Sequence, residues 1–256
     1  MKILKSIAIA FSTYSKIPMP IFEWKDEDMR YSMCFFPWVG AVIGGLVWLW
    51  FRVSVSFGIN TLTYVLIGAA IPLLVTGGIH MDGYMDTMDA FHSYQPRERK
   101  LEILKDSHIG AFSVIMLAVY GLVYLAGFAQ ITDSLSLMVY CFGFFLARCL
   151  SAIGVVSLPT AKQEGMLYQF ADSADGRRVK LLLSVQFLLC CGLMIYVSWK
   201  RGLAVILAAV GSYVYYVYRS KKELGGITGD TAGYFVTLCE GVMVLTAAVT
   251  CILINR

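Results

Sequence analysis

Charged residues are scarce in this chain, and their scarcity excludes an ordinary soluble domain. Only 15% of the 256 residues are Asp, Glu, Lys or Arg, whereas a soluble domain carries about a quarter. Prolines are also few, with six in the whole chain, and 58% of the residues are hydrophobic. This composition is typical of a protein that crosses a membrane several times.

The cysteine pattern excludes a zinc or redox site of the usual kind, because no C-x-x-C spacing occurs. All the cysteines fall in apolar runs, where we expect small buried thiols. They are residues 34, 141, 149, 190, 191, 239 and 251. The chain also lacks a Pro-, Gly- or Ser-rich linker, a low-complexity tract and a convincing internal repeat, which predicts a single integral membrane domain over residues 1–256.

Seven apolar runs are long enough, or nearly so, to cross a bilayer, which takes roughly 17 to 25 residues. They are approximately Met33–Phe51, Leu62–Ile79, Ala111–Gln130, Ser136–Val156, Leu181–Trp199, Leu203–Tyr218 and Thr231–Ile254. The sixth is short, and whether it spans fully is left open. No small-residue cleavage site follows the apolar stretch Ile3–Phe11, so we expect a short interfacial helix rather than a signal peptide. The expected fold is an all-α polytopic bundle of about seven transmembrane helices plus this N-terminal helix.

Basic residues are distributed unevenly between the loops, and this bias predicts the orientation of the chain. If the N-terminus is cytoplasmic, 16 of the 21 Lys and Arg residues lie on that side, four lie outside, and Arg148 falls within the fourth run. Every acidic residue except Asp133 and Glu240 lies on the cytoplasmic side in this arrangement. We therefore expect seven crossings, the N-terminus inside, and an active site that faces the cytoplasm of a prokaryotic cell.

Three aspartates follow the second apolar run, in the sequence T-G-G-I-H-M-D-G-Y-M-D-T-M-D-A-F. An Asp at the centre of a membrane helix costs about 2.5 to 3.5 kcal/mol, so such residues need a cation or water as a partner. On a helix, Asp82, Asp86 and Asp89 share one stripe while His80 points away from it. Carboxylates without cysteine suit Mg²⁺ better than zinc, and Gly83 would admit a phosphate or another helix. The alternative is a set of helix-capping and interfacial acids.

A glycine-rich segment, L-G-G-I-T-G-D-T, precedes the last apolar run. Its amide groups at the start of a helix are suited to phosphate, and Gly225, Gly226, Thr228 and Gly229 are the candidates. Asp230 would add a carboxylate for a metal. The alternative is a helix-entry loop whose Asp or Thr caps the helix.

Two ionisable residues lie inside apolar runs, and buried charges in a bilayer generally find partners within the bundle. Arg148 is a candidate for contact with a substrate phosphate. It would otherwise neutralise the acidic stripe, and a salt bridge to one of those acids that only orients helices explains it equally well. For Glu240 a structural hydrogen-bonding role is favoured.

Further candidates lie in the two long loops. Lys162 and Glu164 would contact an anionic or polar substrate, although a solvated loop is the simpler interpretation. His92 and His108 have the right chemistry for proton transfer, but the sequence identifies no partner for either. The pattern from Arg97 to Asp106 predicts a surface helix.

The first motif resembles G-G-x-H-x-D-G-x-x-D-T-x-D of the cobalamin synthase family, the adenosylcobinamide-GDP ribazoletransferases. L-G-G-I-T-G-D-T resembles a later motif of that family, and the resemblance extends to I-P-M-P, F-F-P-W-V-G, K-D-S-H-I-G and L-P-T-A-K-Q-E-G in the same order. Bulkier residues stand at Tyr84, Met85 and Met88, and Ala90 replaces a common glycine. These departures affect packing more than the acids.

The resemblance implies a Mg²⁺-dependent membrane enzyme of the last steps of vitamin B12 assembly, in the cytoplasmic membrane. It would transfer the cobinamide-phosphate group of adenosylcobinamide-GDP to α-ribazole or its 5′-phosphate, releasing GMP and forming adenosylcobalamin or its 5′-phosphate. We expect the two substrates and the lipid bilayer as partners, no nucleic acid, and leave a homo-oligomer open. The alternatives are a phosphotransferase of the CDP-alcohol type and, further away, an ion-coupled transporter.

The roles that follow are hypotheses about the residues of the two motifs and the loops. The expected magnesium ligands are Asp82, Asp86, Asp89 and Asp230, and one carboxylate, of which Asp89 is the candidate, would instead act as a base. His80 would orient the loop or the substrate. The residues expected to hold phosphate are Gly225, Gly226, Thr228, Gly229, Arg148 and Lys162.

Overall fold

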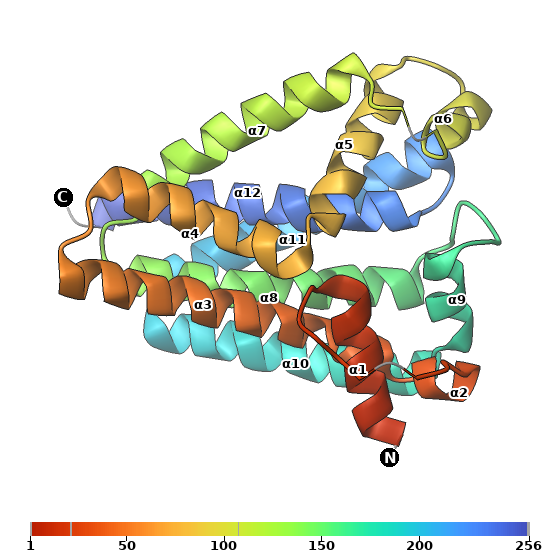
Figure 1. The fold of residues 1–256 in the computed structure, drawn as a ribbon, viewed down its shortest axis with the longest axis horizontal. Coiled ribbons are helices and arrows are strands. Elements are labelled where there is room, and N and C mark those ends of the chain that lie inside the picture. Colours follow the sequence, from red (N-terminus) through yellow and green to blue (C-terminus); the bar gives the residue numbers. More distant parts are fainter. Residues whose placement is uncertain (1, 21, 107, 255–256) are drawn as a thin grey trace.

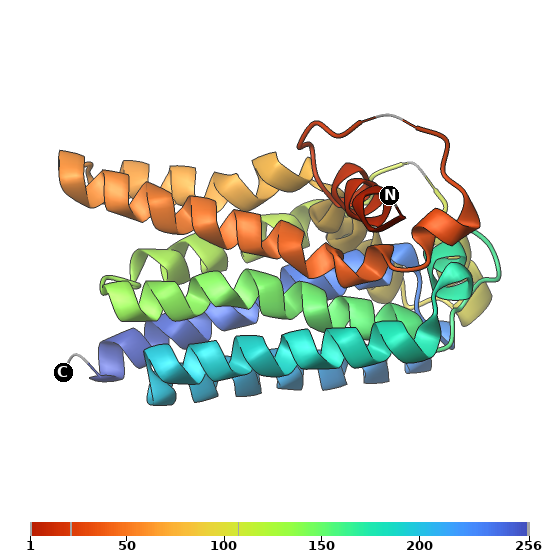
Figure 2. The same ribbon diagram turned by 90° about the horizontal axis from the view of Figure 1, so that it is seen from below.

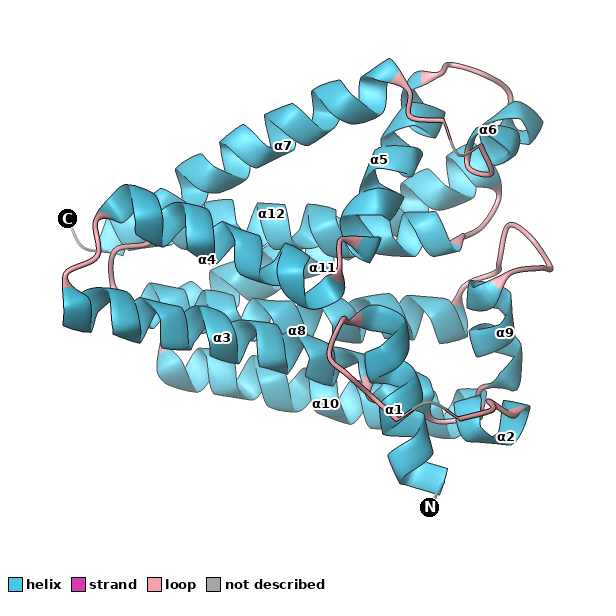
Figure 3. Cartoon of the chain, viewed as in Figure 1, coloured by secondary structure: helices cyan, strands magenta, loops and turns pink. Residues whose placement is uncertain are grey.

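The structure is a computed structural model that describes residues 2–20, 22–106 and 108–254. Within these ranges the chain forms twelve α-helices and one short 3₁₀ helix, with no strand, which confirms the all-α prediction (Figure 3). The helices are α1 (Lys2–Tyr14), α2 (Asp26–Met29), η1 (Ser32–Cys34), α3 (Phe36–Phe57), α4 (Thr61–Thr76), α5 (Ile79–His92), α6 (Arg97–Ile103), α7 (Ala111–Ala129), α8 (Ser134–Ser157), α9 (Met166–Ser173), α10 (Gly176–Val197), α11 (Trp199–Leu224) and α12 (Gly229–Ile254). The predicted N-terminal helix and the surface helix α6 are both present.

Six of the seven predicted runs form helices that are individually long and apolar enough to cross a membrane: α3, α7, α8, α10, α11 and α12. The sixth run, which looked short in the sequence, belongs to α11, a helix of 26 residues. A helix of that length measures about 39 Å, which exceeds the hydrocarbon thickness of a bilayer. The sequence underestimated it because charged residues extend the helix beyond the apolar stretch, Lys200 and Arg201 before it and Arg219, Lys221 and Lys222 after it.

The second run differs from the others because it breaks before it is complete. It ends at Thr76, and α4 meets α5 at an angle of 92°. Gly77 and Gly78 form the break, with φ values of 64° and 83° that favour glycine. The backbone amide of Lys16 donates a hydrogen bond of 2.7 Å to the carbonyl of Val75. As a result, α5 runs across the end of the bundle instead of continuing through it (Figure 1).

Helix α8 is the centre of the bundle, since 78% of its apolar stretch is buried inside the protein. Gly40 and Gly44 of α3 lie one turn apart and pack on the carbonyl groups of Phe144 and Cys141, so closely that a Cβ at either glycine would collide. Small residues at this spacing allow membrane helices to approach backbone to backbone. The sequence of α3 thus determines how α3 and α8 pack.

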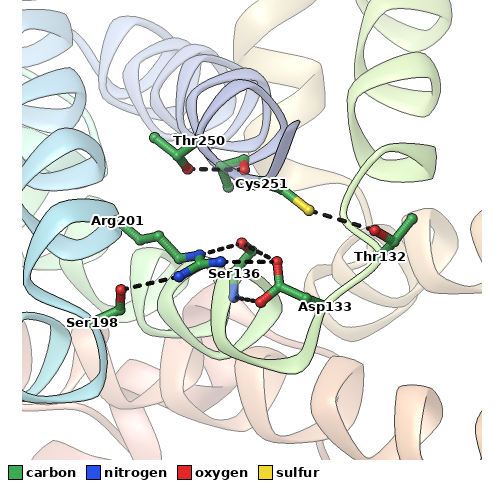
Figure 4. Close-up of polar contacts among 8 residues, drawn as sticks. Thr132, Asp133, Ser136, Ser198, Arg201, Thr250 and Cys251 are labelled. Atoms are coloured by element: carbon green, nitrogen blue, oxygen red, sulfur yellow. Dashed lines mark hydrogen bonds and ion pairs between the residues drawn. The ribbon is translucent and has the colours of Figure 1, made fainter. Parts of the chain in front are cut away.

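The two ends of the bundle carry different polar groups. Asp133 caps the start of α8 by accepting a 2.9 Å hydrogen bond from the amide of Ser136, and Arg201 of α11 donates a 2.8 Å bond to the Ser136 hydroxyl (Figure 4). Arg201 also lies 3.5 Å from the Asp133 carboxylate. At the opposite end lie α1, α2, α5, α6 and α9 (Figure 2). The motifs of the sequence analysis lie at that second end.

Candidate active site

The acidic stripe predicted from the sequence is present on α5. Asp82 is exposed, and Asp86 and Asp89 are half-buried. His80 is turned into the protein, as the helical spacing predicted, and only 7% of its surface is exposed. Since the first turn of α5 follows directly on the glycine break, the break is what presents these acids at the end of the bundle rather than within it.

The stripe meets the second motif through two glycines. A Cβ at Gly83 would lie 2.6 Å from the carbonyl oxygen of Asp230, and a Cβ at Gly233 would lie 3.3 Å from the backbone of His80. Helix α5 therefore packs directly on the first turns of α12. Burial, and then the negative charges of Asp82, Asp230 and Asp89, raise the pKa of the Asp86 carboxylate to about 6. Two segments about 140 residues apart thus supply one cluster of acids.

Asp89 differs from its neighbours because α7 uses its carboxylate. Its Oδ1 accepts a 3.1 Å hydrogen bond from the amide of Ser113, in the first turn of α7. Gly110 precedes that helix, and its backbone lies against the Asp89 carboxylate with no room for a Cβ. A carboxylate in this position satisfies a free amide and complements the positive end of the helix dipole.

Among the described residues, no group of three or more His, Cys, Asp or Glu side chains is arranged to hold a metal ion. Mg²⁺ usually takes only one or two carboxylates and completes its coordination with water and substrate phosphates. Asp82, Asp86 and Asp230 offer oxygen donors of the right kind, without thiol or imidazole competitors. The donor set therefore fits a magnesium site that a phosphate-bearing substrate would complete.

The glycine-rich segment is shaped by its own contacts. Gly225 ends α11 with φ of 74°, and the Arg97 guanidinium of α6 occupies the space of its absent side chain. A Cβ at Gly226 would lie 2.6 Å from the carbonyl oxygen of Pro159, where residues 159–161 form a parallel bridge with Ile227. These two glycines allow the close approach of two loops. Gly229 is exposed, with nothing within 4 Å of where a side chain would start.

Thr228 and Thr231 cap α12 reciprocally. The Thr228 hydroxyl accepts a 3.2 Å bond from the Thr231 amide, and the Thr231 hydroxyl accepts a 2.8 Å bond from the Thr228 amide. The cap foreseen as the alternative is therefore formed. Within this segment, Gly229 is exposed, so its backbone is accessible to a phosphate.

Lys162 lies on the loop that pairs with this segment, in a hollow of about 390 Å³. Asp230, Thr228, Lys105 and Glu164 also line the hollow. Partial burial lowers the pKa of Lys162, and the charge of Asp230 acts in the opposite direction. Glu164 pairs with Lys105 at 2.6 Å on the exposed rim. Lys162 and Asp230 thus line the same hollow.

The remaining candidates have partners in the protein. Arg148 pairs with Glu240 at 2.7 Å and also donates to the carbonyl of Phe144. It therefore forms a salt bridge within the bundle, but its partner is Glu240 and not, as expected from the sequence, an acid of the stripe. The sequence identified no partner for His92 or His108, but the structure places the Met88 carbonyl 2.8 Å from His92 and the Asp106 carboxylate 2.6 Å from His108. Neither histidine lies in the acidic cluster.

Two features of this end escaped the sequence analysis. One is the use of Asp89 by the start of α7, and the other is a cavity beneath the first turn of α5, whose walls include Tyr120 and Tyr124. The G-A-F-S segment after Ile109 carried the only signal for the first, as a glycine before a helix start. No local pattern signals a cavity, because its walls come from five helices.

Comparison with known proteins gives consistent matches along the chain. The sequence profile of a family described as cobalamin-5-phosphate synthase matches residues 6–248. An adenosylcobinamide-GDP ribazoletransferase of Lachnoclostridium phytofermentans is 42% identical over 94% of this chain and 92% of its own length. Proteins of the same name from Clostridium perfringens and Desulfitobacterium hafniense are each 32% identical, over 94% and 95% of this chain and 97% and 96% of their own lengths. No solved structure matches.

Proposed function

The chain belongs to the cobalamin-5-phosphate synthase family, and from this we propose that the acids of α5 and α12 are the active site of an adenosylcobinamide-GDP ribazoletransferase. The enzyme joins the cobinamide-phosphate group to ribazole and releases GMP. The observation that carries the assignment of the site is the contact of Gly83 with Asp230, which brings the two acidic motifs together. The comparisons give no support to the CDP-alcohol or transporter alternatives.

The transfer exchanges one bond to phosphorus for another. The ribazole hydroxyl oxygen bonds to the phosphorus attached to cobinamide, the bond from that phosphorus to GMP breaks, and the hydroxyl proton passes to a carboxylate of α5. Such reactions depend on positioning and on neutralising charge more than on covalent help from the protein. We propose Asp82, which is exposed, or Asp86, which is half-buried, as the carboxylate that accepts the proton.

Magnesium, when bound, would neutralise the diphosphate and stabilise the leaving oxygen of GMP. Asp82, Asp86 and Asp230 would hold it. Lys162 and the backbone of Gly229 would bind phosphate oxygens in the hollow they border. Asp89 was expected from the sequence to be a ligand or a base. We propose instead that it positions α7, because its carboxylate accepts a hydrogen bond from Ser113.

The first test replaces single carboxylates without changing their size. Asp82→Asn and Asp86→Asn should each lower GMP release from adenosylcobinamide-GDP and α-ribazole by about 100-fold or more, which corresponds to ~3 kcal/mol of transition-state stabilisation. Glu102→Gln, which alters an exposed acid of α6 at the same end, is the control and should retain full activity. Turnover at the normal rate in Asp82→Asn or Asp86→Asn would rule out the proposed role.

The second test removes divalent metal. Chelation with EDTA should abolish GMP release, and Mg²⁺ should restore it, because the donors are carboxylates that leave coordination positions for phosphate and water. In Asp82→Asn, half-maximal activity should need at least tenfold more Mg²⁺. An enzyme that remains active in excess EDTA would contradict the metal requirement and leave the family assignment intact.

We also propose that this end of the bundle faces the cytoplasm, since most of the lysines and arginines lie there. The nucleotide-bearing substrate would then reach the acids from the aqueous side, and the apolar helices would hold the enzyme in the cytoplasmic membrane.

A further inference from the structure

A cavity of about 280 Å³ lies beneath the first turn of α5. Helices α4 and α7 lie close together at the far end of the bundle and spread apart toward α5, which closes the triangle (Figure 1). The cavity lies within this triangle, with α8 and α12 supplying its deeper wall. Its walls are mainly aliphatic side chains of α4 and α7, together with Tyr120 and Tyr124.

Most polar groups of the cavity have partners in the protein. Tyr120 donates to the carbonyl of Thr237 at 3.0 Å, Tyr124 shares a 2.7 Å hydrogen bond with Tyr140, and Arg148 pairs with Glu240. The net charge of the wall is therefore close to zero. A site with such a wall suits an uncharged apolar group rather than a phosphate or a carboxylate.

Two side chains of the wall keep unpaired nitrogens: the Nε of Arg148 and both ring nitrogens of His80 have no hydrogen-bond partner in the part of the chain that the structure describes. His80 lines the cavity with 7% of its surface exposed. Its ring lies beside those of Tyr14 and Phe36, and the Tyr14 hydroxyl donates to the Met33 sulfur at 3.8 Å rather than pairing with His80. A buried imidazole with unmade hydrogen bonds is destabilising. A ligand with a ring nitrogen that pairs with His80 would offset part of this destabilisation.

We infer that the cavity holds the aromatic base of the ribazole substrate, an inference that rests on the proposed function. The volume lies just below the range of small-ligand sites, about 300 to 1,000 Å³, and it is too small for a corrin ring. Guanine and the diphosphate are polar or charged, and the wall offers them few free partners. The base of ribazole is a planar, largely apolar benzimidazole with one free ring nitrogen. Both His80 ring nitrogens are covered by protein atoms, so a hydrogen bond from His80 to this nitrogen would require the imidazole to turn toward the cavity.

The cavity also lies in the right place for this substrate. Met81 lines it, and the next residue, Asp82, begins the acidic stripe. Successive side chains leave a helix about 100° apart, so the base would lie under α5 while the acids lie on an adjoining face. In a nucleoside the reacting hydroxyl belongs to the ribose, which separates it from the base. A base under α5 would therefore leave the hydroxyl near the acids.

A lipid chain is the competing occupant, because Leu66 and Leu73 at the wall are also exposed on the outside of the bundle, by 49% and 43%. A hydrocarbon chain would fill the apolar part but would leave both ring nitrogens of His80 without a partner. The two occupants make different predictions for the kinetics of variants that fill the cavity.

The test fills the cavity from α7. Gly121 lines it, and a Cβ at this position would meet nothing within 4 Å, so Gly121→Leu adds volume without a backbone clash. We expect the KM for α-ribazole to rise at least tenfold, while the KM for adenosylcobinamide-GDP stays unchanged. Free 5,6-dimethylbenzimidazole should compete with α-ribazole in the wild type and lose this effect in the variant. Gly211→Leu, on α11 with equally open space, is the matched control and should change neither constant.

His80 provides an independent readout. His80→Phe keeps a ring but removes both nitrogens, and should raise the KM for α-ribazole more than His80→Gln, which keeps a donor and an acceptor. An unchanged KM for α-ribazole in Gly121→Leu and His80→Phe would overturn the inference, and if activity then followed the lipid supplied, the cavity would be a lipid site.

Failure of the inference can be distinguished from failure of the proposed function. Binding of 5,6-dimethylbenzimidazole to the purified protein, followed by its fluorescence, needs no turnover. A wild-type protein that binds the base but never releases GMP would overturn the proposed function and retain the cavity as a base site. A protein that releases GMP normally but whose base binding is insensitive to Gly121→Leu would overturn the cavity assignment and leave the proposed function intact.

Discussion

At the scale of single residues, Asp89 shows that acids on one stripe can have different partners. Its spacing from Asp82 and Asp86 is that of a third metal ligand, and the sequence analysis expected it to act as a ligand or a base. The structure separates it from them, because the Asp89 carboxylate accepts a hydrogen bond from Ser113. That contact joins residues 24 positions apart, across a loop whose path the sequence does not specify.

Substitutions at Asp89 should therefore follow the rules of a helix cap. Asn keeps an oxygen for the Ser113 amide and should retain most of the activity and stability, whereas Ala should cost about 1 kcal/mol of unfolding free energy. Thermal unfolding in detergent and GMP release measure the two effects. If Asp89→Asn is as inactive as Asp82→Asn, Asp89 is a ligand or base and the cap is secondary.

The hydrogen bonds of Thr228 and Thr231 carry the same lesson. From the sequence, phosphate binding and helix capping were equally good explanations of the hydroxyl groups, because both use a polar side chain at the start of a helix. The structure shows the cap formed in both directions. Whether a hydroxyl caps a helix or binds phosphate depends on which atoms surround it in the folded protein, and the sequence does not give these neighbours.

At the scale of helices and loops, the sequence predicted the spans well and their breaks poorly. Apolar runs long enough for a bilayer are a strong signal, since the membrane itself sets their length. The bend at Gly77 and Gly78 is a weaker one, because paired glycines also occur inside membrane helices. The direction of α5 after the bend depends on contacts with α7 and α12 that become apparent only when the helices are packed.

The approach of α5 to α12 gives the clearest prediction at this scale. Gly83→Ala places a Cβ 2.6 Å from the backbone oxygen of Asp230, and backbone cannot move aside as a flexible side chain can. We expect lower thermal stability and a loss of GMP release of at least tenfold, because Asp230 would be displaced from Asp82 and Asp86. Gly176→Ala, where a Cβ meets nothing within 4 Å, is the control. Wild-type activity in Gly83→Ala would mean that the two motifs do not act together.

At the scale of the whole molecule, the bundle separates its polar groups between two ends. The end near Asp133 and Arg201 has a local network that ties α8 to α11, and the other end gathers the acids, Lys162 and the small helices. The bias of basic residues predicted this separation from the sequence. The cavity under α5 was beyond such an analysis, since it exists only because α4 and α7 spread apart in the assembled fold.

The orientation of the bundle follows from the same bias and can be measured directly. Because 16 of the 21 basic residues lie at one end or in its loops, we expect that end in the cytoplasm. Gln163→Cys on the loop before α9 and Lys200→Cys at the start of α11 introduce exposed thiols at opposite ends, whereas the native cysteines are buried or half-buried. A membrane-impermeant maleimide should label Lys200→Cys in intact spheroplasts and Gln163→Cys only after lysis. The reverse pattern would place the acids outside the cell, where neither the proposed active site nor its nucleotide-bearing substrate fits.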